Sequence, residues 1–204
     1  MSQDSDEYIQ LESHNPAWLR LAANERAALI GATGSTPEKV QHIGSTAVPG
    51  LLAKPILDLL FGTDAYPPPE QLVEQICSLG FQCIGEYGLP GRLYFRKRGE
   101  VAVNLHVMLF GCERWLHNLA FRDHLLHSKA ARHRYAAAKL AARDSGANTP
   151  LAYSILPLMK RSAALVRKTS ASRMKNAVAW TMPCAIVLPG CGSSPGTSAT
   201  NMRS

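Results

Sequence analysis

The sequence predicts an α+β fold in which a small mixed β-sheet is packed with helices, with the C-terminal helices at one end of the sheet. Two observations predict it. Apolar runs typical of buried strands are concentrated between residues 39 and 110. The order of elements is a helix, a strand-loop-strand unit, a helix, a short meander and then helices, which is typical of α+β or mixed α/β proteins.

The first helix is expected to begin at Asn15-Pro16 and to end at Gly31. Asn is a strong N-cap, and Pro is tolerated at the first helical position. Residues 39–43 are typical of a short strand, and residues 44–50 of a turn-rich loop. Residues 55–61 are nearly all apolar, which predicts a buried strand beside the first one.

The remaining elements follow from the same patterns. A helix over 70–79 is expected to end at Gly80. Strands are expected over 81–87, 92–96 and 101–110, and helices over 113–127, 129–143 and 149–168. Residues 169–204 are rich in Ser, Thr, Gly and Pro without a sustained period, so we expect a disordered or loosely attached tail after a domain spanning 1–168.

The net charge of +7 comes entirely from the C-terminal part. Residues 1–144 contain 15 basic and 15 acidic residues, whereas residues 145–204 contain seven basic residues and no acidic one. Such a tail could contact nucleic acid or anionic lipid weakly, or could simply be solvated. Because Trp180 is the only aromatic residue after Lys168, we do not expect nucleic acid as a partner.

Cellular location is predicted from two absences in the sequence. No stretch approaches the roughly 18 consecutive apolar residues of a membrane span. The N-terminus is acidic, whereas secretory and mitochondrial signals begin basic. We therefore expect a cytoplasmic protein with no membrane partner. The five cysteines form no C-x-x-C pair, so we expect reduced, mostly buried thiols. The sequence does not predict an oligomeric state.

The segment 42–58 is the candidate site. Gly44 allows a positive φ and a close backbone approach, and Ser45 and Thr46 could cradle an anion with their backbone and hydroxyl groups. Asp58 lies inside an apolar strand, where an ionised carboxylate is costly unless it is paired or metal-bound. Asp58 is therefore expected either in a cleft or as a structural residue bonded to a loop N–H.

Segment 42–58 resembles the signature of the GrpB family, which belongs to the nucleotidyltransferase-like fold superfamily. Further matches in order and spacing are found at 15–18, 85–97, 104–107, 115–125 and 135–139, so the resemblance covers roughly residues 8–168. It implies a nucleotidyltransferase-like fold. In active members of that superfamily a Gly-Ser loop holds a nucleoside triphosphate. Two acids spaced D-x-D and a third on a neighbouring strand hold two Mg²⁺ ions.

Only some of the site residues of active superfamily members have counterparts in this sequence. Gly44 and Ser45 match the Gly-Ser pair, and Asp58 matches the first acid, but the second acid position is Leu60. The strand expected to carry the third acid has Asn104 and His106 instead. The catalytic candidates are therefore Asp58 and His106.

One carboxylate makes a poor Mg²⁺ site, because that ion needs several oxygen ligands. Asp58 with His106, joined by His42, would suit a transition metal better. The expected cofactor is a divalent metal, Mg²⁺, Mn²⁺ or Zn²⁺, with a nucleoside triphosphate as a possible substrate. Either histidine could instead be a packed, hydrogen-bonded residue.

Four basic residues are candidates for binding an anionic ligand beside Gly44, Ser45 and Thr46. They are Lys54, Arg92, Arg96 and Arg122. Arg92 and Arg96 share one strand face, and a planar guanidinium suits phosphate or carboxylate. Glu86, on the preceding strand, could pair with either of them instead.

Two functions are compatible with these features. The first is a GrpB-type protein that binds a nucleotide or phosphorylated small molecule in a Gly-Ser/Asp cleft and could transfer a nucleotidyl group to a small acceptor. The second is a catalytically silent binding or stabilising module, because the resemblance includes domains fused behind dephospho-CoA kinase. The retained Gly-Ser pair favours the first, and the missing second carboxylate favours the second.

Overall fold

The computed structural model describes residues 11–144. The helix expected over 149–168 and the tail expected over 169–204 lie outside the described residues. The helices are α1 (Ala17–Thr33), α2 (Glu70–Ser78), α3 (Glu113–His127) and α4 (Lys129–Asp144), with 3₁₀ turns η2 (Pro37–Lys39) and η3 (Ser45–Ala47). The strands are β1 (Val40–Ile43), β2 (Ile56–Thr63), β3 (Gln82–Gly85), β4 (Arg92–Lys97) and β5 (Ala102–Leu109).

The strands form one five-stranded mixed sheet in the order β1-β2-β5-β4-β3. The central pair β2 and β5 is parallel, and every other neighbouring pair is antiparallel. The sheet therefore confirms the predicted α+β class, and β1 and β2 are neighbours as expected. Because β2 and β5 run parallel, Asp58 is opposite Asn104, and Leu60 is opposite His106.

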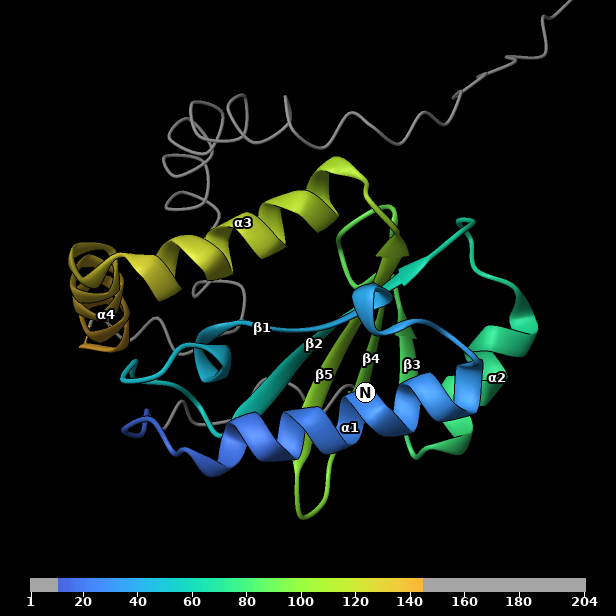
Figure 1. The fold of residues 1–204 in the computed structure, drawn as a ribbon, viewed down its shortest axis with the longest axis horizontal. Coiled ribbons are helices and arrows are strands. Elements are labelled where there is room, and N and C mark those ends of the chain that lie inside the picture. The colour runs from blue at the N-terminus through green and yellow to red at the C-terminus, as the bar shows by residue number, and fades with distance from the viewer. Residues whose placement is uncertain (1–10, 145–204) are drawn as a thin grey trace, which may run out of the picture. The chain divides into compact units, whose positions relative to one another are not determined.

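One face of the sheet carries the main apolar core. Leu59 of β2, Leu105 of β5 and Phe95 of β4 are fully buried on this face. They pack in one cluster with Leu29 of α1 and Ile76 of α2. Figure 1 shows α1 running across the strands, with α2 beside β3. The alternation of apolar side chains along the strands thus sends every second residue into this core and leaves the others for the opposite face.

The opposite face, which we call the Asp58 face, is covered by α3 at one end. Trp115 of α3 packs there against Leu60, Met108 and Ile43. In Figure 1, α3 and α1 lie on opposite sides of the sheet, and α4 follows at the far end of α3. The rest of the Asp58 face is polar, which sets the place of the candidate site.

Helix α1 differs from the expectation at its end. It continues through Gly31 to Thr33 and is terminated by Gly34, which adopts a left-handed conformation. The hydroxyl of Thr33 donates to the carbonyl of Leu29, which supports the extra turn. At its start the helix begins one residue later than expected, at Ala17 with Pro16 as the N-cap, and the side chain of Asn15 accepts a hydrogen bond from the Ala17 N–H at 2.9 Å.

The cysteines also differ from the expectation. Cys77 and Cys83 are exposed, Cys112 is half-buried, and all three are free thiols. The prediction of mostly buried thiols is therefore wrong for the described residues, because Cys77 and Cys83 occupy outward positions of α2 and of the edge strand β3. Within residues 11–144, no helix has the length and apolar character needed to cross a bilayer.

Candidate functional site

The turn after β1 lies directly against Asp58. Ile43, the last residue of β1, is opposite Asp58 in the sheet. Gly44 follows with φ 73° and ψ −170°, a conformation that is essentially limited to glycine. A Cβ added to Gly44 would overlap Asp58 Oδ2 and lie 2.9 Å from Asp58 Cβ. Gly44 is therefore required both by the backbone and by the space, and this residue, which precedes Ser45, lies directly against the carboxylate.

Replacing Gly44 with alanine is expected to lower the free energy of unfolding by about 2–4 kcal/mol, because backbone strain and the overlap with Asp58 add together. Urea denaturation would measure the loss. Gly34→Ala is the matched control, since Gly34 has φ +65° with nothing within 4 Å of the added methyl group. That variant should lose only the left-handed penalty, about 1 kcal/mol. Equal losses for the two variants would contradict the close approach to Asp58.

Asp58 is held by two neighbours on β5. The amide of Asn104 donates to Asp58 Oδ1 at 3.0 Å, and His106 Nε2 lies 3.8 Å from the same oxygen. Burial acts to raise the pKa of Asp58, but His106 and the Asn104 hydrogen bond outweigh it, so the pKa lies below its ordinary value. The side chain is 32% exposed. Asp58 is thus an ionised, oriented and accessible carboxylate at neutral pH.

Asn104 is oriented by a network of hydrogen bonds on the Asp58 face. Its Oδ1 accepts hydrogen bonds from the Tyr94 hydroxyl at 2.8 Å and from Arg98 at 3.2 Å. With its oxygen occupied, the amide presents its NH₂ group to Asp58. The Tyr94 ring also packs 5.5 Å from the His106 ring. The position expected to carry a third acid therefore serves to orient the first.

The structure does not supply the carboxylates of a two-metal site. Leu60, at the second acid position, is fully buried against Trp115 and Met108. Asn104 donates to Asp58 instead of offering a second charge. Among residues 11–144, no three His, Cys, Asp or Glu side chains are grouped so as to hold a metal ion. The residues present do not fit the two-Mg²⁺ arrangement of active nucleotidyltransferases.

His42 does not join Asp58 and His106. In the β1–β2 register it is opposite Leu59, so it projects to the side of α1, whereas Asp58 is opposite Ile43. Its Nε2 shares a 2.9 Å hydrogen bond with the hydroxyl of Thr46. Burial lowers the pKa of His42 to about 4, so the ring is neutral at physiological pH.

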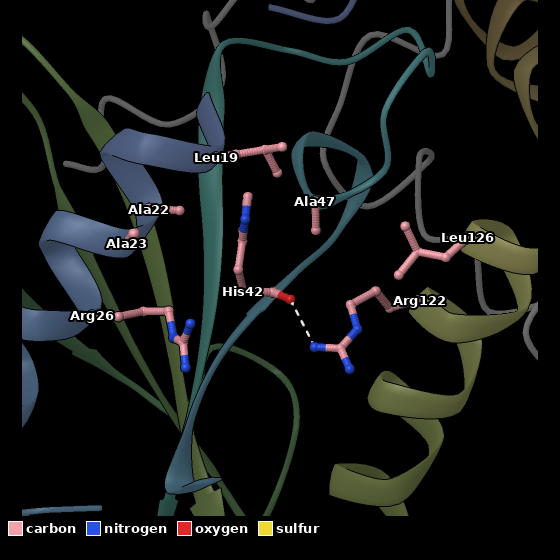
Figure 2. Close-up of a pocket in the computed structure, with 8 residues that line it drawn as sticks. All are labelled: Leu19, Ala22, Ala23, Arg26, His42, Ala47, Arg122 and Leu126. Carbon is pink, nitrogen blue, oxygen red and sulfur yellow. Dashed lines mark hydrogen bonds between the residues drawn. The ribbon is translucent and has the colours of Figure 1, made fainter. Parts of the chain in front are cut away.

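A pocket of about 260 Å³ lies at this side of β1, apart from the Asp58 face. Figure 2 shows α1 contributing to one wall, Ala47 and α3 to the other, and the His42 ring between them. The lining residues are Leu19, Ala22, Ala23, Arg26, His42, Ala47, Arg122 and Leu126. This pocket therefore lies on the other side of the edge strand from Asp58, where we expected the ligand-binding cleft.

Two of the arginines expected to bind an anion are engaged in holding the fold. Arg92 is 8% exposed and donates to the backbone carbonyls of Glu86 and Tyr87, with its Nη1 3.4 Å from His106 Nδ1. Arg122 donates to the carbonyl of His42 and pairs with Asp123 at 2.8 Å.

Arg96 is two strands from Asp58, and its Nε donates to Gln82 on β3 at 3.5 Å. The pairing considered for Glu86 is not formed by its carboxylate, which accepts from the Tyr66 hydroxyl and the Gly91 N–H. Lys54, the fourth basic candidate, lies close enough to Lys139 for its charge to contribute to the lowering of the pKa of that amine.

Lys139 and Tyr135 of α4 complete the site, and neither residue was predicted from the sequence to belong to it. Lys139 is 7% exposed, and its Nζ donates to Ser45 Oγ at 2.8 Å and to the Leu52 carbonyl at 2.9 Å. The Tyr135 hydroxyl lies 3.4 Å from Ser45 Oγ. The i, i+4 spacing of Tyr135 and Lys139, within a segment that matched the family, was the available signal.

The ammonium of Lys139 lies 5.3 Å from the centroid of the Tyr135 ring, which belongs to an apolar cluster. Val48, Leu51, Leu125, Ala131 and Tyr135 are the buried members of this cluster, which joins α3 and α4 to the loop after Ser45. Burial lowers the pKa of Lys139 to about 8, the charge of Asp58 acts in the opposite direction, and that of Lys54 adds to the lowering. The result is a titratable amine in contact with the Ser45 hydroxyl.

The GrpB protein family model matches residues 8–155. The chain is 31% identical over 118 residues to UPF0157 protein YqkA of Bacillus subtilis, covering 57% of this chain and 34% of YqkA. It is 28% identical over 123 residues to the glutamate-rich protein GrpB of Alkalihalophilus pseudofirmus, covering 57% and 71% of the two chains. The chain thus spans about a third of YqkA.

A solved structure supports the same relationship. The crystal structure of the conserved protein GrpB from Enterococcus faecalis superimposes with a TM-score of 0.66 at 30% sequence identity. The match covers 74% of this chain and 93% of the other.

Proposed function

Because the chain belongs to the GrpB family, we propose that it binds a nucleotide or another phosphorylated small molecule at a site formed by the Ser45 turn, Lys139 and Asp58. The observation that carries this proposal is the position of Lys139, a buried cation in hydrogen-bond contact with Ser45. An ammonium held beside a Gly-Ser turn provides a charge-assisted donor for a phosphate oxygen. Transfer of a nucleotidyl group to a small acceptor is the reaction proposed for this site.

Asp58 and His106 would act on the ligand from the β2–β5 side. The carboxylate can accept a hydrogen bond from a ribose or acceptor hydroxyl, and its fixed orientation favours one geometry. The pair offers one oxygen and one nitrogen, which is enough to bind a single divalent ion only together with ligand oxygens. The proposal therefore includes a dependence of ligand binding on Mg²⁺, Mn²⁺ or Zn²⁺. Measuring binding with and without each ion tests this dependence.

A catalytically silent binding module is the second candidate. The burial of Leu60 and the use of Asn104 as a donor remove the acids needed for two-metal phosphoryl transfer. A silent module would keep ligand affinity and show no turnover. Product analysis on a ligand identified by binding distinguishes the two functions.

The test is a thermal-shift screen of nucleotides and phosphorylated CoA-pathway metabolites on the full chain, each with and without Mg²⁺, Mn²⁺ or Zn²⁺, followed by calorimetry on every hit. A ligand at 100 times its dissociation constant should stabilise the fold by about 2.7 kcal/mol. Lys139→Met is expected to weaken binding of a hit by about 10- to 100-fold, because a charge-assisted hydrogen bond contributes about 1.5–3 kcal/mol.

Lys129→Met is the matched control, since Lys129 is exposed on the same helix. Asp58→Asn tests the other wall of the site and should weaken metal-dependent binding; because it also removes the charge that Asn104 and His106 contact, its stability is measured beside its affinity. Absence of any hit, or equal affinities for the Lys139 and Lys129 variants, would contradict the proposal.

A further inference from the structure

The Ser45 hydroxyl lies at a turn and in contact with a buried amine. It follows β1 at a sharp turn, with Gly44 at φ 73°, and its Oγ lies 2.8 Å from Lys139 Nζ. The Lys139 amine also donates to the Leu52 carbonyl at 2.9 Å. When Lys139 is neutral, its remaining hydrogens can serve that carbonyl while its lone pair accepts the Ser45 proton.

A hydroxyl is a weak nucleophile unless an adjacent group accepts its proton, and a lysine desolvated by its surroundings can do so near neutral pH. The apolar cluster beneath α4 supplies the desolvation. Within residues 11–144, three titratable side chains face the amine or the Ser45 hydroxyl: Asp58 from β2, Lys54 from the loop before β2 and Tyr135 from the same helix. The geometry and the burial together provide a nucleophile and its base.

We propose that Ser45 is a nucleophile activated by Lys139 and forms a covalent ester with an electrophilic phosphorus atom. In this step the bond from Ser45 Oγ to phosphorus forms, the bond from phosphorus to the leaving group breaks, and the leaving group departs with the electron pair. The hydroxyl proton moves to Lys139 Nζ. With a nucleoside triphosphate attacked at its α-phosphorus, the products are nucleotidylated Ser45 and pyrophosphate.

The identity of this natural substrate rests on the proposed function, whereas the reactivity of Ser45 does not. The experiment therefore uses a probe that needs no nucleotide site. A fluorophosphonate reacts with an activated hydroxyl by the same bond changes, with fluoride as the leaving group. The full chain would be incubated with the probe, and intact-mass and peptide mass spectrometry would locate the adduct.

The expected result is a single adduct on Ser45 that is absent from Ser45→Ala. Lys139→Arg keeps the cation but cannot accept a proton at these pH values, so it should slow labelling by about 100-fold or more. Lys129→Met, the exposed control on α4, should label like the parent protein. Circular dichroism of each variant verifies folding.

The labelling rate of the unmodified protein is a second measurement that needs no variant. It should rise as the pH increases through about 8, where Lys139 loses its proton. A rate that is flat or falls over this range would overturn the proposal, as would an adduct elsewhere or unchanged labelling of Lys139→Arg. Loss of labelling in Tyr135→Phe with normal labelling in Lys139→Arg would also overturn it, because Tyr135 would then be the base.

The outcomes separate this inference from the proposed function. Labelling of Ser45 without any nucleotide hit would support Ser45 as a nucleophile and would contradict the proposed nucleotide site. Nucleotide binding without labelling would show that Ser45 and Lys139 serve only to bind phosphate. A structural anchor between α4 and the Ser45 turn predicts lower stability for Ser45→Ala and no reaction with the probe.

Discussion

Leu60→Asp is expected to lower the free energy of unfolding by about 4 kcal/mol or more and to create no Mg²⁺ site. This substitution restores the D-x-D spacing that is missing at Asp58. Leu60, however, is fully buried against Ile43, Met108 and Trp115. The variant loses that packing and also places a carboxylate where it has little water.

His106 cannot compensate the new charge. It is opposite Leu60 in the sheet, but its Nε2 already lies 3.8 Å from Asp58 Oδ1. Two carboxylates two residues apart on one strand face would share a single histidine and repel each other. The second charge must therefore be buried unpaired or neutralised, and both alternatives destabilise the fold.

Urea denaturation of Leu60→Asp, Leu60→Asn and Leu60→Met separates the cost of altered packing from the costs of burying a polar group and a charge. The Met variant should lose less than about 1.5 kcal/mol because it nearly conserves volume. The Asn variant measures the cost of a buried neutral polar group, and its difference from Asp is the cost of the charge. A Leu60→Asp protein that stays folded and is stabilised by Mg²⁺ would refute this account and would show that a two-metal site can be rebuilt.

The sheet and its helices could be predicted because apolar residues determine them locally. Segment 55–61 is nearly all apolar, and the strand β2 spans Ile56–Thr63. The end of α1 was harder to predict, since a glycine can lie inside a helix at a modest cost and Gly31 does so. The helical conformation continued to Gly34, where a left-handed residue ended it.

The candidate site was predictable only in part, because it depends on register and on packing between distant segments. Asp58 and His106 share a face through the alternation of side chains once β2 and β5 are known to be parallel and in register. His42 was misplaced because the register of β1 against β2, which sets the face of each side chain, is not predictable from the sequence. Lys139 is 94 residues from Ser45 in the chain, and no local pattern predicts how α4 packs.

Binding of a phosphorylated ligand should weaken about tenfold between pH 7 and pH 9 if Lys139 supplies the cation. The pKa of Lys139 is lowered by burial to about 8, so the amine is mostly protonated at pH 7 and mostly neutral at pH 9. A bound phosphate favours the protonated form, and affinity is therefore lost as the pH rises through this value. The sign is opposite to that of Ser45 labelling, which needs the neutral amine.

Calorimetry on any ligand found in the screen, at half-unit intervals between pH 7 and pH 9.5, would measure this dependence. The ligand phosphate is already fully ionised over that range, since its second pKa is near 6. Lys139→Arg is the decisive variant, because a guanidinium remains charged throughout and should make the affinity independent of pH. If the parent protein shows constant affinity, or the Arg variant keeps the tenfold loss, the titrating group is not Lys139 and the phosphate must be bound elsewhere.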